Sequence, residues 1–215
     1  MQDVKSPQGQ IELAEGAFRA GADQAALSVF AKLAHDGNPV AQYWLAHMTE
    51  LGLGTAKDPA KAIDLYKKAA DQGNVAAQAR LGEIYLEGDI DAPDFQSARV
   101  YLDKAAIQGH ARAALLLGHI YRLGIGTAAD PTEAFAWLEV ASLENNALAR
   151  HERSALLAKL TPQQQETAVE RSKALMSAIK TRTGLPASGV STAAAVNGAT
   201  PAGAPVGGAA AAGKP

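Results

Sequence analysis

Three residues spaced 36 apart carry side chains that could bind a metal ion: His47, Glu83 and His119. If this interval reflects repeated helices, neighbouring helices lie about 8–10 Å apart, whereas zinc ligands lie about 2.0–2.2 Å from the ion. We therefore expect no metal site. A pH-responsive groove is a second hypothesis, because histidine titrates near pH 6.5. The third interpretation, ordinary solvated side chains, is the one we favour.

Other catalytic chemistry lacks the residues it requires. The chain has no cysteine, which excludes disulfides, Cys-ligated metal sites and thiol nucleophiles. It contains no Gly-x-Ser-x-Gly motif, no Ser-x-x-Lys acylation site with its companion motifs, and no phosphate-binding Gly-x-x-x-x-Gly-Lys loop that continues in Ser or Thr. Asp89, Asp91 and Asp94 lack the frame of an EF-hand, and we expect Asp94 to be a helix cap. The sequence thus predicts no catalytic residues and no cofactor.

Charge and hydropathy narrow the classes of partner. A net charge of −2 gives no general attraction for nucleic acid, and no apolar run approaches the ~20 residues of a transmembrane helix. Residues 1–7 lack the features of a signal peptide, so we expect either a cytoplasmic protein or a mature exported form whose leader was removed. We expect residues 1–9 to be a flexible N-terminus and the Ala/Gly/Pro-rich residues 184–215 to be a disordered tail.

The chain has an internal period of 36 residues. Columns at this interval are Ala41, Ala77, Ala113 and Ala149; Ala26, Ala62, Ala98 and Ala134; Leu45, Leu81 and Leu117; and Gly52, Gly88 and Gly124. They predict units at 39–74, 75–110 and 111–146, flanked by an atypical unit at about 10–38 and a terminal cap at 147–183. Polar terminal units would shield the open ends of a stack of repeats.

The pattern within each unit predicts two helices joined by a short loop. Apolar residues recur at three- and four-residue spacing, which is typical of an amphipathic helix. The first helix of a unit runs at about 39–51 and ends at Gly52, and the second begins after Asp58-Pro59 and runs to about 72. The sequence therefore predicts an all-α solenoid of about five antiparallel hairpins.

The first helices supply the candidate binding surface. Taking Leu45, Leu81 and Leu117 as core, positions two residues before and after them point the other way. The residues predicted to line this groove and bind a partner are Tyr43, His47, Glu50, Glu83, Leu86, Leu115, His119 and Arg122. An exposed aromatic at Tyr43 would be a natural anchor.

Other aromatic and basic residues have more ordinary interpretations. Tyr85 and Tyr121 share one column, and Tyr101 and Trp137 share another, so we expect these four rings to be buried. Arg150, His151 and Arg153 form a basic cluster. It could bind an acidic partner segment, although a solvated face is the interpretation we favour.

The motif Ala113-x3-Leu117-Gly118-x2-Tyr121-x2-Gly124-x-Gly126, together with Asp130, Ala134 and Trp137 in phase, resembles the Sel1-like repeat, a subfamily of the tetratricopeptide-like α-solenoids. The resemblance implies a right-handed superhelix, most often bacterial, whose concave groove binds a protein or peptide. It implies a non-enzymatic adaptor or regulator, and some relatives act in the periplasm. We therefore expect a protein or peptide partner, a periplasmic location with a cytoplasmic alternative, and a monomer or weak homodimer.

Two narrower hypotheses remain open at this point. Relatives of this size and repeat number include periplasmic negative regulators of two-component sensor kinases, and this resemblance is loose. The other hypothesis, from a different class, is an envelope hydrolase or its activator. The absence of cysteine does not support the disulfide-braced, penicillin-binding type of relative.

Overall fold

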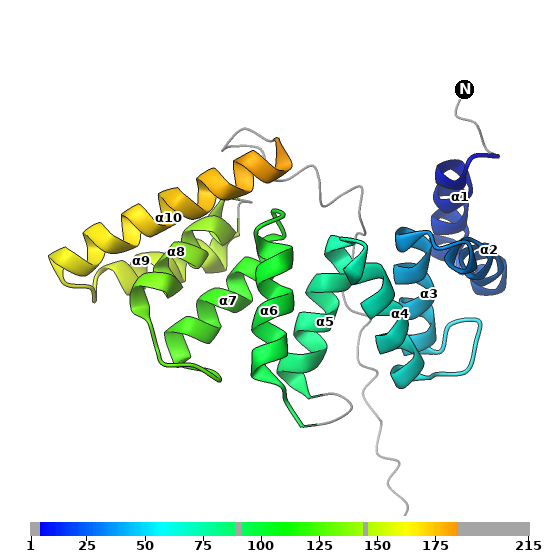
Figure 1. Ribbon diagram of the computed structural model, residues 1–215, viewed down its shortest axis with the longest axis horizontal. Coiled ribbons are helices and arrows are strands. Elements are labelled where there is room, and N and C mark those ends of the chain that lie inside the picture. The colour runs from blue at the N-terminus through cyan, green and yellow to red at the C-terminus, as the bar shows by residue number, and fades with distance from the viewer. Residues whose placement is uncertain (1–4, 89–91, 144–145, 185–215) are drawn as a thin grey trace, which may run out of the picture.

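The computed structural model (Figure 1) describes residues 5–88, 92–143 and 146–184, in which all regular secondary structure is helical. The helices are α1 (Pro7–Arg19), α2 (Asp23–His35), α3 (Pro39–Leu51), α4 (Pro59–Asp71), α5 (Val75–Glu87), α6 (Phe95–Ala106), α7 (Ala111–Leu123), α8 (Pro131–Ser142), α9 (Ala147–Leu157) and α10 (Pro162–Thr183). Helices α1 to α8 form four packed hairpins that follow one another along the long axis of the molecule, and α9 and α10 both pack on α8. The predicted all-α solenoid is confirmed, although its last two helices contact α8 more than each other.

The helix bounds follow the predicted units closely, with one difference at the N-terminus. Helix α3 has the predicted range, and α4 ends one residue earlier than predicted. Helix α1 begins at Pro7, where Ser6 accepts a hydrogen bond from the N–H of Gly9, so residues 7–9 are helical and not part of a flexible N-terminus. The tail predicted at 184–215 lies outside the described residues, apart from Gly184.

Polar caps recur at the start of the first helix in four units. Asn38, Asn74 and Asn146 accept hydrogen bonds from backbone N–H groups through their side chains, and His110 does the same at the equivalent position. Each cap satisfies backbone donors that a helix start leaves without a partner. These caps fix where each first helix begins.

A repeated pairing of small with large residues brings the two helices close together in the hairpins α5–α6 and α7–α8. Gly82 of α5 lies against Leu102 of α6, where an added Cβ would come within 2.5 Å of the leucine Cγ. Gly118 lies against Leu138 in the next unit, with a corresponding distance of 2.8 Å. Both leucines are fully buried. The glycines are thus required by the packing of the helices and not by a turn.

Buried glutamines connect successive units. Gln78 of α5 donates to the carbonyl oxygen of Ala70 in the preceding unit, at 3.0 Å, and accepts from Gln108 at 2.7 Å. Gln42 makes the equivalent pair of contacts one unit earlier. Because both amides are buried and satisfied, they specify the register between neighbouring hairpins.

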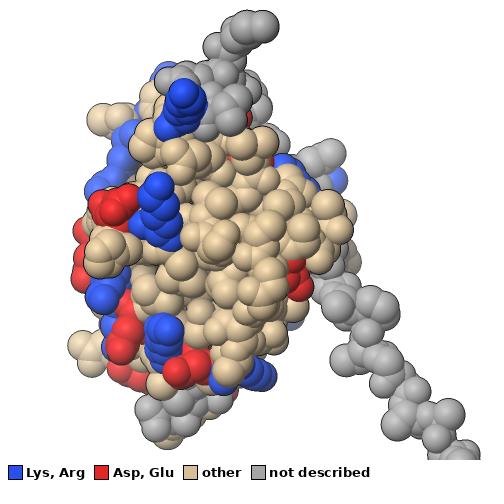
Figure 2. Space-filling view, turned by 90° about the vertical axis from the view of Figure 1, so that its right-hand side faces the viewer, with Lys and Arg blue, Asp and Glu red and all other residues tan. Residues whose placement is uncertain are grey.

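The two ends of the solenoid differ in charge. Exposed residues of α10 include Glu170, Arg171 and Lys173, as the prediction of a polar terminal unit requires. Viewed from the end that carries α1 and α2, however, the surface has a broad area without acidic or basic side chains (Figure 2). Exposed uncharged residues of α1, α2 and the turn between them include Leu13, Gly16, Ala20, Ala22, Ala25 and Ser28. Exposed polar residues such as Arg19, Gln24 and Lys32 also belong to these helices, so the N-terminal end combines a broad uncharged area with polar side chains.

The histidine cap makes stability depend on pH. The Nδ1 atom of His110 accepts from the N–H of Ala113 at 3.2 Å, so it must be unprotonated. Burial lowers the pKa of His110, although the carboxylate of Glu83 opposes this effect. As the pH falls below about 6.5, the unfolded chain takes up a proton before the folded protein does, and the free energy of unfolding decreases.

We expect His110→Asn to keep the cap, because asparagine occupies this position in three other units. The variant should lose less stability than the wild type between about pH 7.5 and 5.5. Part of the pH dependence should remain, because burial also lowers the pKa of His47. Urea unfolding across this range measures the difference, and identical pH dependence in both proteins would contradict the prediction.

Candidate functional site

The first helices α3, α5, α7 and α9 present a common surface, which we call the groove face. It consists of the residues that point away from the side packed on α4, α6 and α8. Leu81 and Leu117 are fully buried on the packed side. Glu83 and His119, two residues further along, lie on the groove face and are half-buried, as helix geometry requires.

A network of charged residues connects α3, α5 and α7 across this face. Arg80 Nε donates to both carboxylate oxygens of Glu50, at 3.1 and 3.3 Å, and Arg80 Nη1 donates to Glu83 at 3.3 Å. Arg112 of α7 in turn donates to Glu83. The side chains of Glu50 and Arg80 are only 14% and 24% exposed, so this pairing is screened less by solvent than an ordinary surface ion pair.

Glu50 also accepts a hydrogen bond from a buried tyrosine. The hydroxyl of Tyr66 donates to Glu50 Oε2 at 2.7 Å and lies 3.5 Å from Nδ1 of His47. Burial opposes ionisation of Glu50, but the hydrogen bonds from Arg80 and Tyr66 hold its pKa below the ordinary value. This carboxylate is therefore ionised at neutral pH and fixed in position.

A second charged group lies at the other end of the groove face. Glu152 of α9 contacts His119 Nε2 at 2.7 Å and Arg122 Nε at 3.9 Å. In the repeat, Arg122 is equivalent to Glu50, and Glu152 is equivalent to Arg80. The two interfaces thus carry the same ion pair with its charges reversed.

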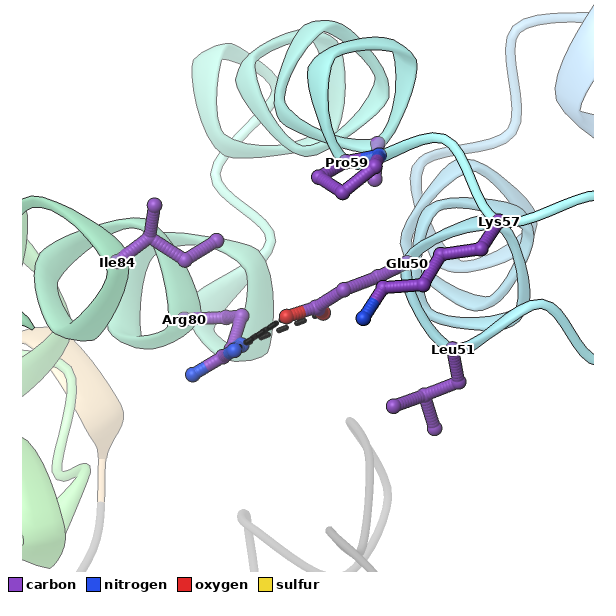
Figure 3. A pocket seen from close by; sticks show the side chains of 7 residues that line it. Glu50, Leu51, Lys57, Pro59, Arg80 and Ile84 are labelled. Atoms are coloured by element: carbon purple, nitrogen blue, oxygen red, sulfur yellow. Dashed lines mark hydrogen bonds and ion pairs between the residues drawn. The ribbon is translucent and has the colours of Figure 1, made fainter. Parts of the chain in front are cut away.

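Two hollows lie at these ion pairs, along the edge of the groove face, and the first also reaches α4. The first, of about 360 Å³, lies between α3, α4 and α5 (Figure 3), and its lining residues are Glu50, Leu51, Lys57, Pro59, Ala62, Arg80 and Ile84. The second, of about 440 Å³, lies between α7 and α9, and its lining residues are Arg122, His151, Glu152, Ala155, Leu156 and Lys159. Each combines charged groups with apolar side chains.

Seven of the eight predicted groove residues are exposed or half-buried. Arg122 is exposed, and the half-buried ones are His47, Glu50, Glu83, Leu86, Leu115 and His119. Their role in binding a partner stays a prediction. Of these residues, Glu50 lines the first hollow and Arg122 lines the second.

The prediction that Tyr43 is an exposed anchor is wrong. The ring is only 3% exposed and lies 5.5 to 6.2 Å, between ring centroids, from Trp44, His47 and Tyr66. The first hairpin adds Phe18 and Phe30, which pack on Trp44. Burial raises the pKa of Tyr43 to about 12. This residue belongs to an aromatic core between the first two units.

The four rings predicted to be buried fall into two groups. Trp137 is 1% exposed, as predicted. Tyr85, Tyr101 and Tyr121 are half-buried, so the prediction is wrong for them. Tyr85 and Tyr101 stack on one another at 5.8 Å between centroids, and the Lys104 amine lies over the Tyr101 ring.

Sequence reasoning missed the partners of the predicted residues. Arg80, Arg112 and Glu152 each pair with a residue of the preceding unit, about 30 residues earlier. The period of 36 compares equivalent positions and does not reveal pairs between different ones. Oppositely charged residues about 30 residues apart, which is six fewer than the period, are the signal that could have revealed these partners.

The described part of the chain gives no sign of two other kinds of site. In it, no group of three or more His, Asp or Glu side chains is arranged to hold a metal ion. None of its helices combines the length and the apolar character needed to cross a membrane. The cluster Asp89 and Asp91 lies outside the described residues, and Asp94 caps α6 by accepting from the N–H of Ser97 at 3.0 Å, as predicted.

The fold and the groove face define a helical-hairpin repeat protein of the α-solenoid class. The Sel1 repeat family model matches residues 39–74, 75–110 and 111–146, which are the three predicted units. Because these matches cover half of the chain, the protein belongs to the Sel1 repeat family.

Solved structures support this assignment. A Sel1 repeat protein from Oxalobacter formigenes is 35% identical with a TM-score of 0.64, over 70% of this chain and 45% of that one. A protective antigen of uropathogenic Escherichia coli with an SLR fold is 26% identical with a TM-score of 0.52, over 94% of this chain and 51% of that one. The protein thus spans about half the length of these two chains. No curated protein matches it.

The burial of Tyr43 predicts a structural role for this residue. We expect Tyr43→Ala to lower the free energy of unfolding by about 3–5 kcal/mol, because it leaves a cavity among Trp44, His47 and Tyr66. Tyr43→Phe keeps the ring and is the control, with a change below about 1 kcal/mol. Urea denaturation measures both. A loss below about 1 kcal/mol for the alanine variant would place the ring on the surface instead.

Proposed function

We propose that this protein is a non-enzymatic binding module that captures a segment of a partner protein on its groove face. Sel1 repeat proteins are generally adaptors for protein interactions. The observation that carries the proposal for this chain is the pair of hollows on one face, each combining a fixed ion pair with apolar side chains. Such a combination suits recognition of a peptide through both shape and charge.

Exposed leucines beside the hollows support this proposal. Leu51 and Leu123 occupy equivalent positions near the ends of α3 and α7, four residues after His47 and His119, and are 51% and 58% exposed. Leu148 of α9 is 51% exposed. Helix spacing places Leu51 and Leu123 on the groove face, where they offer apolar area that a partner could cover.

The narrower hypotheses concern which partner is bound and where. A periplasmic regulator would hold a sensor kinase inactive by occupying one of its segments, whereas an envelope hydrolase activator would bind the hydrolase itself. Both use the same groove face and both stay predictions. Cell fractionation followed by identification of the cross-linked partner distinguishes them from each other and from a cytoplasmic adaptor.

Substitution of an exposed groove leucine tests the proposed function. We expect Leu123→Asp to reduce cross-linked partner recovered from the native host by about tenfold or more, because the new charge would be buried against the partner's apolar surface. Leu13→Asp on α1 is the matched control, since Leu13 is equally exposed, at 58%, on another helix. Both variants should keep the wild-type melting temperature.

The two variants separate the groove face from the rest of the surface. If Leu123→Asp captures the same partner as well as the wild type does, the groove face is not the binding surface. If Leu13→Asp loses the partner equally, binding depends on the uncharged N-terminal end of the solenoid instead. Either result contradicts the proposal.

A further inference from the structure

The two hollows share three equivalent positions of the repeat, whereas their lysines occupy different positions. Glu50, Arg80 and Ile84 of the first hollow correspond to Arg122, Glu152 and Leu156 of the second, two repeats later. Ile84 and Leu156 are buried, at 5% and 9% exposed, and form an apolar floor in each hollow. The solenoid therefore presents the same small binding feature twice on one face.

Among the residues that line each hollow, positive charges outnumber negative charges by one. The ion pairs Glu50–Arg80 and Arg122–Glu152 neutralise themselves, but Lys57 also lines the first hollow and Lys159 the second. Figure 3 shows the Lys57 side chain extending beside Glu50 toward the hollow. Both lysines are exposed and form no ion pair with another described residue. A carboxylate of a ligand is the group that complements them.

At the interface between the two hollows, apolar residues occupy the repeat positions that form ion pairs at the hollows. Leu86 of α5 and Leu116 of α7 occupy the positions that Glu50 and Arg80 hold one unit earlier. Both leucines are half-buried against the core. At these two positions a ligand meets apolar side chains, beside the Glu83–Arg112 ion pair that joins α5 to α7.

The spacing of the hollows sets the spacing of the ligand's charges. Neighbouring packed helices are about 8–10 Å apart, so two steps of the repeat span roughly 16–20 Å. An extended chain advances about 3.3 Å per residue, and side chains an even number of residues apart point the same way. Two carboxylates about six residues apart on one strand therefore match both hollows.

From this geometry we propose that the groove face binds an extended acidic segment at two anchor points. Two acidic side chains about six residues apart approach Lys57 and Lys159, and an apolar side chain between them lies over Leu86 and Leu116. The proposal rests on the proposed function and names the chemistry of the partner segment: acidic, apolar at its centre and extended.

Synthetic peptides test the two-anchor arrangement directly. The probes are fluorescein-labelled dodecapeptides with glutamate at positions 3 and 9 and leucine at positions 5 and 7, which share one face of an extended strand, in an Ala/Thr background. One control peptide carries lysine in place of both glutamates, and another has the same composition with glutamates three residues apart. Fluorescence anisotropy with the full chain at about 50 mM salt, where charge interactions are weakly screened, gives the dissociation constants.

We expect the six-spaced glutamate peptide to bind at least about tenfold more tightly than either control peptide. Lys57→Gln and Lys159→Gln should each weaken its binding by about threefold or more, as expected for an exposed charge pair. Lys173→Gln, an exposed lysine on α10, is the control and should leave binding unchanged. Because all three lysines are exposed, folding should be preserved.

The remaining outcomes overturn the proposal. If the lysine peptide binds as well as the glutamate peptide, or if none of the peptides binds, the groove face does not select acidic segments. If the three-spaced peptide binds equally, there is one anchor and not two. If partner capture still depends on Leu123 while the peptides show no preference, the proposed function stands and the two-anchor ligand is wrong.

Discussion

The close approach of two helices within each repeat is the constraint on which the rest of the structure depends. Gly82 and Gly118 let α6 and α8 press their fully buried leucines against α5 and α7, and no larger side chain fits there without displacing Leu102 or Leu138. Since each first helix is fixed against its own second helix, its opposite side is left to form the groove face. The groove face is thus a consequence of the packing on the other side of the same helices.

Repetition explains how one face carries two similar hollows whose ion pairs have opposite orientations. The packed side of each first helix must keep its small and apolar residues, because neighbouring units interlock there. The groove face has no such requirement. Its equivalent positions therefore hold Glu50 and Arg80 at one interface, Leu86 and Leu116 at the next, and Arg122 with Glu152 at the last. Specificity can be changed on this face without a change of fold.

The period, the unit bounds and the helix caps could be predicted from the sequence because they depend on residues close together in the chain. The groove residues were predicted from one helix considered alone, and this is why Tyr43 was misplaced: the rings that bury it include Tyr66 of the next helix, and the first hairpin adds Phe18 beside Trp44. Ion pairs between different positions of neighbouring units were missed for the same reason. Contacts between units require the three-dimensional stacking.

A double-mutant cycle on Gly118 and Leu138 tests the central constraint most directly. Gly118→Ala alone should lower the free energy of unfolding by about 1–3 kcal/mol through overpacking, and Leu138→Ala alone by about 2–5 kcal/mol. Gly16→Ala, where an added Cβ meets nothing within 4 Å, is the control and should be neutral or stabilising. The double variant should lose at least about 1 kcal/mol less than the sum, because the added methyl enters the space the leucine leaves. Additive losses, or a neutral Gly118→Ala, would contradict the account.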